Sequence, residues 1–404
     1  MSPRKTSKVG TSHTTAALCV GSRPTLTELQ QRFGCVALLL QGGGALGAYQ
    51  GGVYEALADA GIHPTWAAGV SIGAINAAII AGNAPEERVK KLRKFWEDLT
   101  ASPFGASLDL QASMAQGNMM RTWMNQMHSA LAATAGTQGF FRPRLPPPWL
   151  AQPGTIEATS YYDTTALKST LERLIDFDRI NHDETHLSVG AVNVRSGNFV
   201  CFASGTHKIR SEHIMASGAL PPGFAAVEID GEHYWDGGIV SNTPLQWVFE
   251  SGVPHNTLAF QVDLWSARGR LPRTLQEVST RMKEIQFSSR TRAGTTRLKD
   301  MHQLQRAIDE LLPLLPEDLR QSPAAKTLDG SGSSRIYNIV HLIYRAKEYE
   351  GDTKDFEFSR LTMEEHWRAG FNDARRTLRH NEIFDPASGK DGVFTFDVEV
   401  DGRE

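Results

Sequence analysis

The chain has 404 residues, which is enough for one large α/β domain or two ordinary ones. Its formal net charge is −3 and 22% of its residues are charged, so no global field attracts nucleic acid. No apolar run approaches the roughly 20 residues that span a bilayer, and Thr15–Val20 is too short for the core of a signal peptide. The three cysteines, Cys19, Cys35 and Cys201, are widely spaced, which argues against a disulfide framework or a zinc site and favours a reducing cytoplasm.

From the N-terminus, the pattern alternates between strands and helices. Residues 1–33 are polar and rich in Ser and Thr, and we expect a flexible segment there. The expected strands lie at 36–41, 65–70, 187–194, 198–203 and 257–263, and the expected helices at about 46–60, 74–82, 85–98 and 209–217. Turn residues at 196–197 and 230–231 predict two hairpins. Strands that alternate with helices predict an α/β fold with a mainly parallel sheet covered on both faces.

The composition changes after Leu264. Residues 274–311 predict one or two basic helices, 317–335 a loop and 336–343 a strand. Thr362 and Glu365 form a capping-box pattern before a helix that runs to about 379. We therefore divide the chain into a main α/β domain, 34–265, and a mostly helical C-terminal extension, 266–404, packed on that domain.

Residues 101–160 differ from the rest of the main domain because they are rich in methionine and aromatic residues. Half of the ten methionines fall in this segment, and large aromatic residues accompany them. The residues that we single out are Met114, Met119, Met120, Met124, Met127, Trp123, Phe140, Phe141 and Trp149. Methionine adapts its shape to flexible apolar chains, so the segment could be a lid over an apolar pocket. A static helical cap packed on the core is the alternative.

Gly42, Gly44 and Gly47 fit the dinucleotide-binding fingerprint G-x-G-x-x-G after a strand-like run. That function needs an acidic residue about 20 positions further on, at the end of the next strand. Asp59 comes too early, and the expected place is occupied by G-V-S-I-G at 69–73. The glycine loop therefore predicts something other than a nucleotide site.

G-V-S-I-G fits the nucleophile elbow, in which a strand turns sharply into a helix and exposes a serine. Gly69 and Gly73 would relieve crowding around Ser71. The alternative is a small-residue helix start with Ser71 as a simple N-cap.

The glycine loop would then expose backbone N–H groups that stabilise a tetrahedral oxyanion. Gly43 and Gly44 are the expected donors, with Gly42 as a possible third. A tight packing turn is the alternative for this loop.

The general base is less easily read from the sequence. Several histidines follow Ser71 in the order of an ordinary hydrolase triad, but none has a distinctive turn context: His255, His302, His341, His366 and His380. Asp236 directly follows a strand and precedes Gly237 and Gly238, which would let its carboxylate reach a neighbouring loop. A plain β-turn is the alternative for this D-G-G sequence.

Together these blocks resemble the patatin-like phospholipases, a family of lipid acyl hydrolases. The matching blocks are G-G-G-A-L-G at 42–47, G-V-S-I-G at 69–73, A-S-G-A-L-P-P-G-F at 216–224 and D-G-G at 236–238. The resemblance covers about residues 34–265 and implies a three-layer α/β/α fold with a Ser71–Asp236 dyad that needs no histidine. The C-terminal residues resemble an extension found in a bacterial subgroup. Many members carry Arg or Lys where this chain has Leu46, which makes ester hydrolysis a firmer expectation than phospholipid as the substrate.

The leading hypothesis is a serine hydrolase of lipid acyl esters that uses no metal and no organic cofactor. An acyltransferase, or a hydrolase of short hydroxyacid esters, would carry the same motifs, and an inactive scaffold is the non-enzymatic alternative. The basic stretch Arg281–Arg306 could face an anionic membrane at its cytoplasmic surface, or could be a solvated helix face. The expected partner is therefore a lipid or acyl ester, and no nucleic acid; the oligomeric state is left open.

Overall fold

The computed structural model describes residues 26–101, 117–182, 184–250, 256–288, 291–329, 335–347, 349–386 and 392–397. The expected flexible residues 1–25 lie outside these ranges, as do Met114 and His255.

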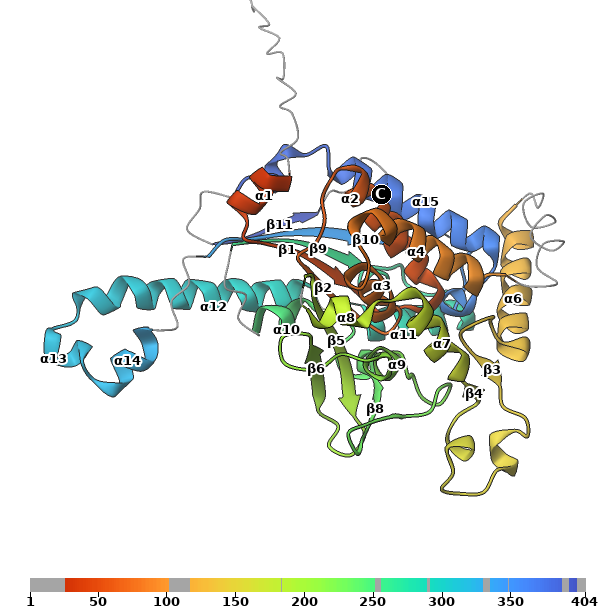
Figure 1. Cartoon of the computed structure of the whole chain (residues 1–404). Helices are drawn as coiled ribbons and strands as arrows, with labels where there is room; N and C mark the ends of the chain where they lie inside the picture. Colours follow the sequence, from red (N-terminus) through yellow and green to blue (C-terminus); the bar gives the residue numbers. More distant parts are fainter. Residues whose placement is uncertain are drawn as a thin grey trace, which may run out of the picture.

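The centre of the fold is a nine-stranded sheet with the order β11-β10-β9-β1-β2-β5-β8-β7, in which β6 also pairs with β5 (Figure 1). The strands from β11 to β5 run parallel, whereas β6 and β8 each pair antiparallel with β5, and β7 pairs antiparallel with β8. Their bounds are β1 Cys35–Leu40, β2 Trp66–Val70, β5 His186–Asn193, β6 Phe199–Ala203, β7 Val227–Ile229, β8 Glu232–Asp236, β9 Thr257–Asp263, β10 Tyr337–Ile343 and β11 Val393–Asp397. A small sheet pairs β3 Arg142–Pro143 with β4 Tyr162–Asp163.

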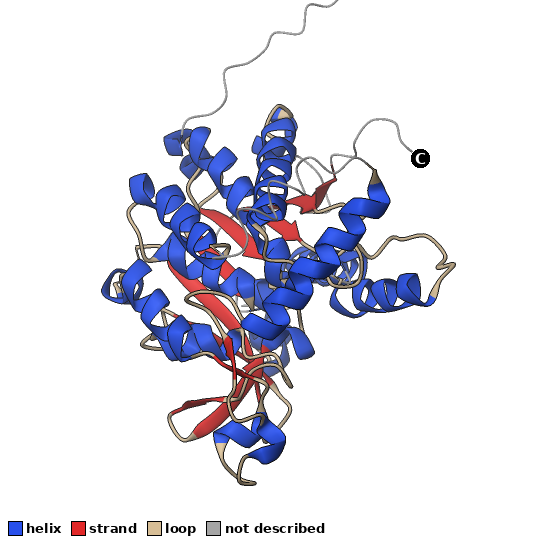
Figure 2. Cartoon of the chain, turned by 90° about the vertical axis from the view of Figure 1, so that its right-hand side faces the viewer, coloured by secondary structure: helices blue, strands red, loops and turns tan. Residues whose placement is uncertain are grey.

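Helices cover both faces of the sheet, as Figure 2 shows. They are α1 Leu26–Arg32, α2 Ala48–Asp59, α3 Ile72–Ala81, α4 Pro85–Leu99, α6 Asn118–Ala135, α7 Thr165–Leu174, α8 Phe177–Asn181, α9 Ser211–Ser217, α10 Leu245–Glu250, α11 Leu275–Phe287, α12 Thr291–Leu311, α13 Glu317–Arg320, α14 Pro323–Asp329 and α15 Arg360–Thr377. Successive side chains of β1 enter two separate cores: Leu38 faces the core with α2, α3 and α15, and Leu39 faces the one with α10. This arrangement confirms the three-layer α/β/α fold with a mainly parallel sheet.

The C-terminal extension is mostly helical, but it also completes the central sheet. β10 pairs with β9 along its whole length, and β11, which the sequence pattern did not reveal, pairs with β10. The extension also contributes to the helical layers, because its α15 packs closely against α2. In contrast, α12 extends away from the sheet and carries α13 and α14 at its far end (Figure 1).

Three local predictions differ from the structure. Residues 26–32 form α1, whose Leu29 is fully buried with the adjoining Phe33, because apolar contacts with the core fix the end of the expected flexible segment. The expected loop 317–335 contains α13 and α14. The N-cap of α15 is Ser359 rather than Thr362, since the Ser359 side chain accepts a bond from the Thr362 N–H at 3.2 Å.

Candidate active site

Ser71 lies between β2 and α3 in a backbone conformation that side chains rarely adopt, with φ 57° and ψ −126°. Its N–H donates to the backbone oxygen and to Oγ of Ser217, both at 3.1 Å. A Cβ on Gly69 would lie 2.2 Å from the Gly73 oxygen, and one on Gly73 would lie 2.3 Å from the Leu40 oxygen. Glycine is therefore required on both sides of the serine. The Ser71 side chain makes no capping bond to α3, unlike a simple N-cap.

Asp236 is the last residue of β8, and its side chain meets Ser71 inside the protein. The carboxylate is 2% exposed, accepts a 2.7 Å bond from the Gly238 N–H and is hydrogen-bonded to the Ser71 side chain. Burial raises the pKa of Asp236 to about 7, while the bonds from Ser71 and Gly238 act in the opposite direction. A Cβ on Gly237 would lie 2.5 Å from the Gly190 oxygen, so this glycine lets the turn pack against β5.

The glycine loop follows β1 and lies beside Ser71. Among the described residues, no acceptor is found for the N–H of Gly43 or Gly44. Gly42 is less available as a donor than we predicted, because its N–H already donates to the Asn242 carbonyl at 3.4 Å. Gly44 has φ 56°, and a Cβ there would lie 2.3 Å from the Asp355 oxygen, so only glycine allows the extension to approach so closely. Gly47 lies further on and packs against Ile72.

These groups meet in one cavity of about 90 Å³ whose remaining wall is mainly apolar. Ser71, Asp236, Gly42, Gly43 and Gly44 all contribute to it. The aromatic wall residues come from every part of the chain: Phe140, Phe141, Phe224, Trp265, Phe287, Phe356 and Phe358. Phe287, Phe356 and Phe358 lie in the C-terminal extension, and Trp265 lies directly before it. The extension therefore forms part of the cavity.

The segment 101–160 reaches the cavity through residues other than its methionines. Phe140 and Phe141 are buried and line the wall. Met119, Met120 and Trp123, which we regarded as lid residues, are at least half exposed and do not line the cavity. The described part of the segment thus supplies two aromatic contacts rather than a methionine-lined pocket.

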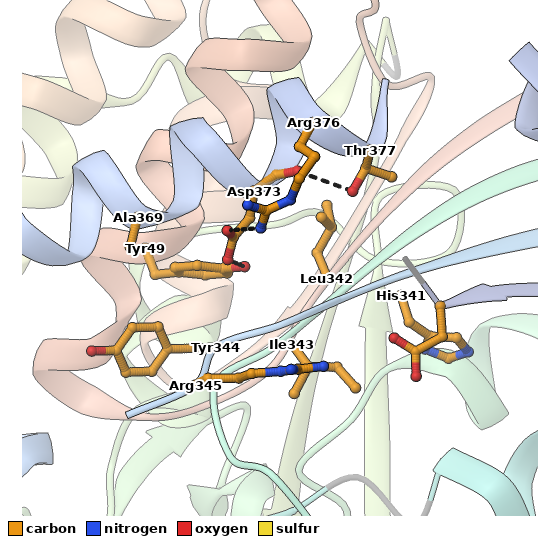
Figure 3. A pocket seen from close by; sticks show the side chains of 11 residues that line it. Tyr49, His341, Leu342, Ile343, Tyr344, Arg345, Ala369, Asp373, Arg376 and Thr377 are labelled. Carbon is orange, nitrogen blue, oxygen red and sulfur yellow. Dashed lines mark hydrogen bonds and ion pairs between the residues drawn. The ribbon is translucent and has the colours of Figure 1, made fainter. Parts of the chain in front are cut away.

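No histidine is among the described residues that line this cavity. His302 and His366 are buried elsewhere, and His341 lines a different cavity of about 200 Å³ at the carboxyl end of β10. Figure 3 shows that second cavity, where Asp373 accepts bonds from Tyr49 and Arg376. None of the predicted catalytic or oxyanion residues lines it.

Sequence reasoning missed two supporting groups. Asn242 follows the D-G-G turn, and its amide donates to the Gly42 oxygen at 3.1 Å and to the Phe287 oxygen at 2.8 Å, which ties the glycine loop to α11. Asp355 lines the cavity next to Gly44, and burial raises its pKa although Lys283 beside it acts in the opposite direction. The only sequence signal for Asn242 was its position as a polar residue shortly after the D-G-G sequence. No local pattern in the sequence indicated Asp355. Leu46, in turn, is completely buried in the core and does not line the cavity.

A strained serine beside a buried carboxyl and glycine N–H groups, on a mainly parallel α/β sheet, is the arrangement expected of a serine hydrolase. The family model described as "Patatin-like phospholipase" matches residues 38–248, and one described as "Patatin phospholipase" matches residues 285–389. The chain belongs to the patatin-like phospholipase family.

The other comparisons add little. A search of curated proteins gave no significant match. The crystal structure of VipD from Legionella pneumophila is similar at 13% identity and a TM-score of 0.36, with 85% of this chain and 66% of that chain covered. The chain thus spans just under two thirds of the length of VipD.

The described residues contain no group of three or more His, Cys, Asp or Glu placed to hold a metal ion. None of their helices combines the length and the apolar character that crossing a bilayer requires.

Proposed function

We propose that the protein hydrolyses lipid acyl esters through a Ser71–Asp236 dyad and an acyl-enzyme intermediate. The observation that carries this proposal is the buried Asp236 carboxyl bonded to the strained Ser71, in a cavity shared with the unpaired N–H groups of Gly43 and Gly44. A base with a pKa near neutrality is well suited to take a proton from a serine hydroxyl at physiological pH.

The proposed reaction has two halves. Ser71 Oγ attacks the ester carbonyl while Asp236 accepts its proton, and the resulting oxyanion binds the N–H groups of Gly43 and Gly44. Asp236 then gives the proton to the departing alcohol, which leaves an acyl-serine. Water attacks that ester while Asp236 accepts its proton, and Asp236 then returns the proton to Ser71 Oγ as the acid product departs. The dyad's own groups account for every proton in this sequence.

The cavity wall supports an acyl chain as the group that is bound next to Ser71. Phe140, Phe141 and Phe358 offer apolar surface, and the charged residue Asp355 sits on the glycine-loop side. No arginine or lysine is among the described lining residues, so a phosphate head group would lie outside the cavity. We therefore propose that the enzyme selects its substrate mainly by the acyl group, with membrane lipid as the source.

A fluorophosphonate probe tests this proposal directly. We expect it to label the intact protein at Ser71, as located by peptide mass spectrometry, and to leave Ser71→Ala unlabelled. An acyl-ester panel followed by mass spectrometry should show release of free fatty acid. A folded protein that takes up no probe and releases no acid from any ester would overturn the proposal.

A further inference from the structure

α11 presents four apolar side chains to solvent and several charged side chains to the protein. Leu275 is 86% exposed and Met282 63%, and Val278 and Ile285 are also exposed. At about 100° per residue these four fall within an arc of about 80° on one side of the helix. None of the residues of α11 is buried. A surface helix of a globular protein ordinarily has the reverse orientation, with its apolar face towards the core.

Ion pairs hold the opposite face of α11 to residues 352–355, further along the C-terminal extension. Lys283 Nζ lies 2.9 Å from the Asp355 carboxylate and donates to the Asp352 carbonyl at 2.8 Å. Glu284 pairs with Lys354 at 2.9 Å. At the other end, Thr274 caps the helix by accepting a bond from the Glu277 N–H. The orientation is thus fixed from the protein side, and the apolar face stays outward.

The C-terminal end of α11 reaches the cavity that Ser71 and Asp236 line, from the side of the helix opposite to its apolar face. Phe287, the last residue of the helix, lines that cavity, and its carbonyl accepts the Asn242 amide. The loop that leads from Asp236 to Asn242 exposes Ile239 and Val240. Phe356 both lines the cavity and is 38% exposed. Exposed apolar side chains therefore occur both on α11 and next to the cavity.

We infer that α11 docks the protein on an anionic lipid surface, with its apolar face in the interface and the catalytic cavity opening beside it. This inference rests on the proposed function, because the lipid ester would then be taken from the surface on which the helix lies. Arg273 is exposed in the loop before the helix, where it complements anionic head groups. This loop also exposes Leu271.

A second copy of the chain could also cover the apolar face of α11. The area of this face is too small for a stable interface between two copies. The outward face of a 13-residue helix, about 20 Å long and 10 Å wide, offers about 200 Å². A stable protein interface buries about 800 Å² on each partner. Insertion of a few apolar side chains into a lipid surface has no such minimum area.

The test compares two matched pairs of substitutions. Leu275→Gln with Met282→Gln changes the face of α11, and Leu304→Gln with Leu311→Gln changes two exposed leucines at the same spacing on α12. Glutamine adds no charge and keeps a good helix propensity. Each pair is placed in the full-length Ser71→Ala protein, and co-sedimentation with phosphatidylglycerol–phosphatidylcholine vesicles is measured. We expect the partition coefficient to fall at least ~10-fold for the α11 pair and less than ~2-fold for the α12 pair.

The same pairs of substitutions, placed in the protein that keeps Ser71, separate this inference from the proposed function when activity is measured. Turnover of a dissolved short-chain ester should be the same with and without the α11 pair, whereas turnover of an ester in vesicles should fall. Equal vesicle binding by both pairs and the parent would overturn the role of α11, as would equal loss in both pairs. A smaller oligomeric mass for the α11 pair with unchanged vesicle binding would assign the face to a second copy. Vesicle binding without turnover of any ester would instead refute the proposed function and leave the docking intact.

Discussion

The Asp236 carboxyl combines full burial with a hydrogen bond to Ser71. Burial favours the protonated form and the two hydrogen bonds favour the carboxylate, and burial is the larger influence. The outcome is a pKa of about 7, compared with an ordinary value of 3.8. A single residue therefore has the strength of a base that a histidine provides in other hydrolases.

If Asp236 is the base, both dyad residues are needed for the same step. We expect Ser71→Ala and Asp236→Asn each to lower kcat by at least ~10³, and the double variant to lose no more than either single one. His302→Ala, His341→Ala and His366→Ala should retain turnover within a small factor, since these side chains lie away from the cavity. The measurement is kcat on one ester for all six variants, with circular dichroism to confirm folding. A folded histidine variant as inactive as Ser71→Ala would assign the base to that histidine.

The raised pKa also makes opposite predictions for activity and stability. Below about pH 7 the carboxyl is protonated, so kcat/KM should rise as pH increases through about 7 and then level off. The pKa of Asp236 is higher in the folded protein than in the unfolded chain. Its contribution to the free energy of unfolding is therefore complete below about pH 4 and is lost as the pH rises to about 7. Three pKa units correspond to at most about 4 kcal/mol.

Asp236→Asn removes this titration and supplies the control. Its free energy of unfolding should exceed that of the unmodified protein at pH 8 and match it near pH 4, as measured by urea titration at both values. A difference that does not change between these two pH values would contradict the assignment of the raised pKa to Asp236.

At the scale of elements, the segment 101–160 contacts the cavity through Phe140 and Phe141, which follow its methionine-rich helix α6. Phe140 packs edge-on against Phe141 and against Phe224 in the cavity wall, and Phe141 packs at a tilt against Phe224. We expect Phe141→Ala to reduce kcat/KM for a C16 ester more than for a C4 ester, because each buried methylene of a long chain contributes about 0.8 kcal/mol. Met120→Ala, at an exposed position of the same segment, is the matched control and should leave kcat/KM unchanged for both esters. Equal losses on both esters for Phe141→Ala would mean that the cap does not contact the acyl chain.

The difference between predictable and unpredictable elements follows from the range of the interactions that fix them. The Ser71 elbow, the glycine loop and the Asp236 turn require particular residues for local backbone reasons, so their positions could be predicted from short patterns. α1, β11 and the cavity contacts of Phe140 depend on partners far away in the chain, such as the pairing of β11 with β10. Leu46 is a related case: its pattern suggested a head-group position, but complete burial in the core makes it a packing residue.

For the whole molecule, the extension and the main domain share one sheet and one core. β9 lies between β1 of the main domain and β10 of the extension. α15 packs on α2, and α2 follows directly from the glycine loop that lines the cavity. Asp355 and Phe358 of the extension complete the cavity wall. The expected boundary at residue 265 is therefore a boundary in sequence but not between independent cores.

Two glycines in helices of the extension test this integration. A Cβ on Gly370 of α15 would lie 2.0 Å from the Tyr49 backbone oxygen of α2, whereas one on Gly294 of α12 would meet nothing within 4 Å. Gly→Ala inside an exposed helix ordinarily stabilises by up to about 1 kcal/mol, and we expect that for Gly294→Ala. In Gly370→Ala the helices must separate, and overpacking of this kind costs about 1–3 kcal/mol.

Urea titration should therefore place Gly370→Ala about 2–4 kcal/mol below Gly294→Ala in free energy of unfolding. Because α2 begins at the glycine loop, Gly370→Ala should also lower kcat on a dissolved short-chain ester under conditions where the protein is still folded, and Gly294→Ala should not. Equal stability of the two variants would show that α15 is not held tightly against α2. Lower stability with unchanged kcat would show that the extension supports the fold without positioning the oxyanion donors.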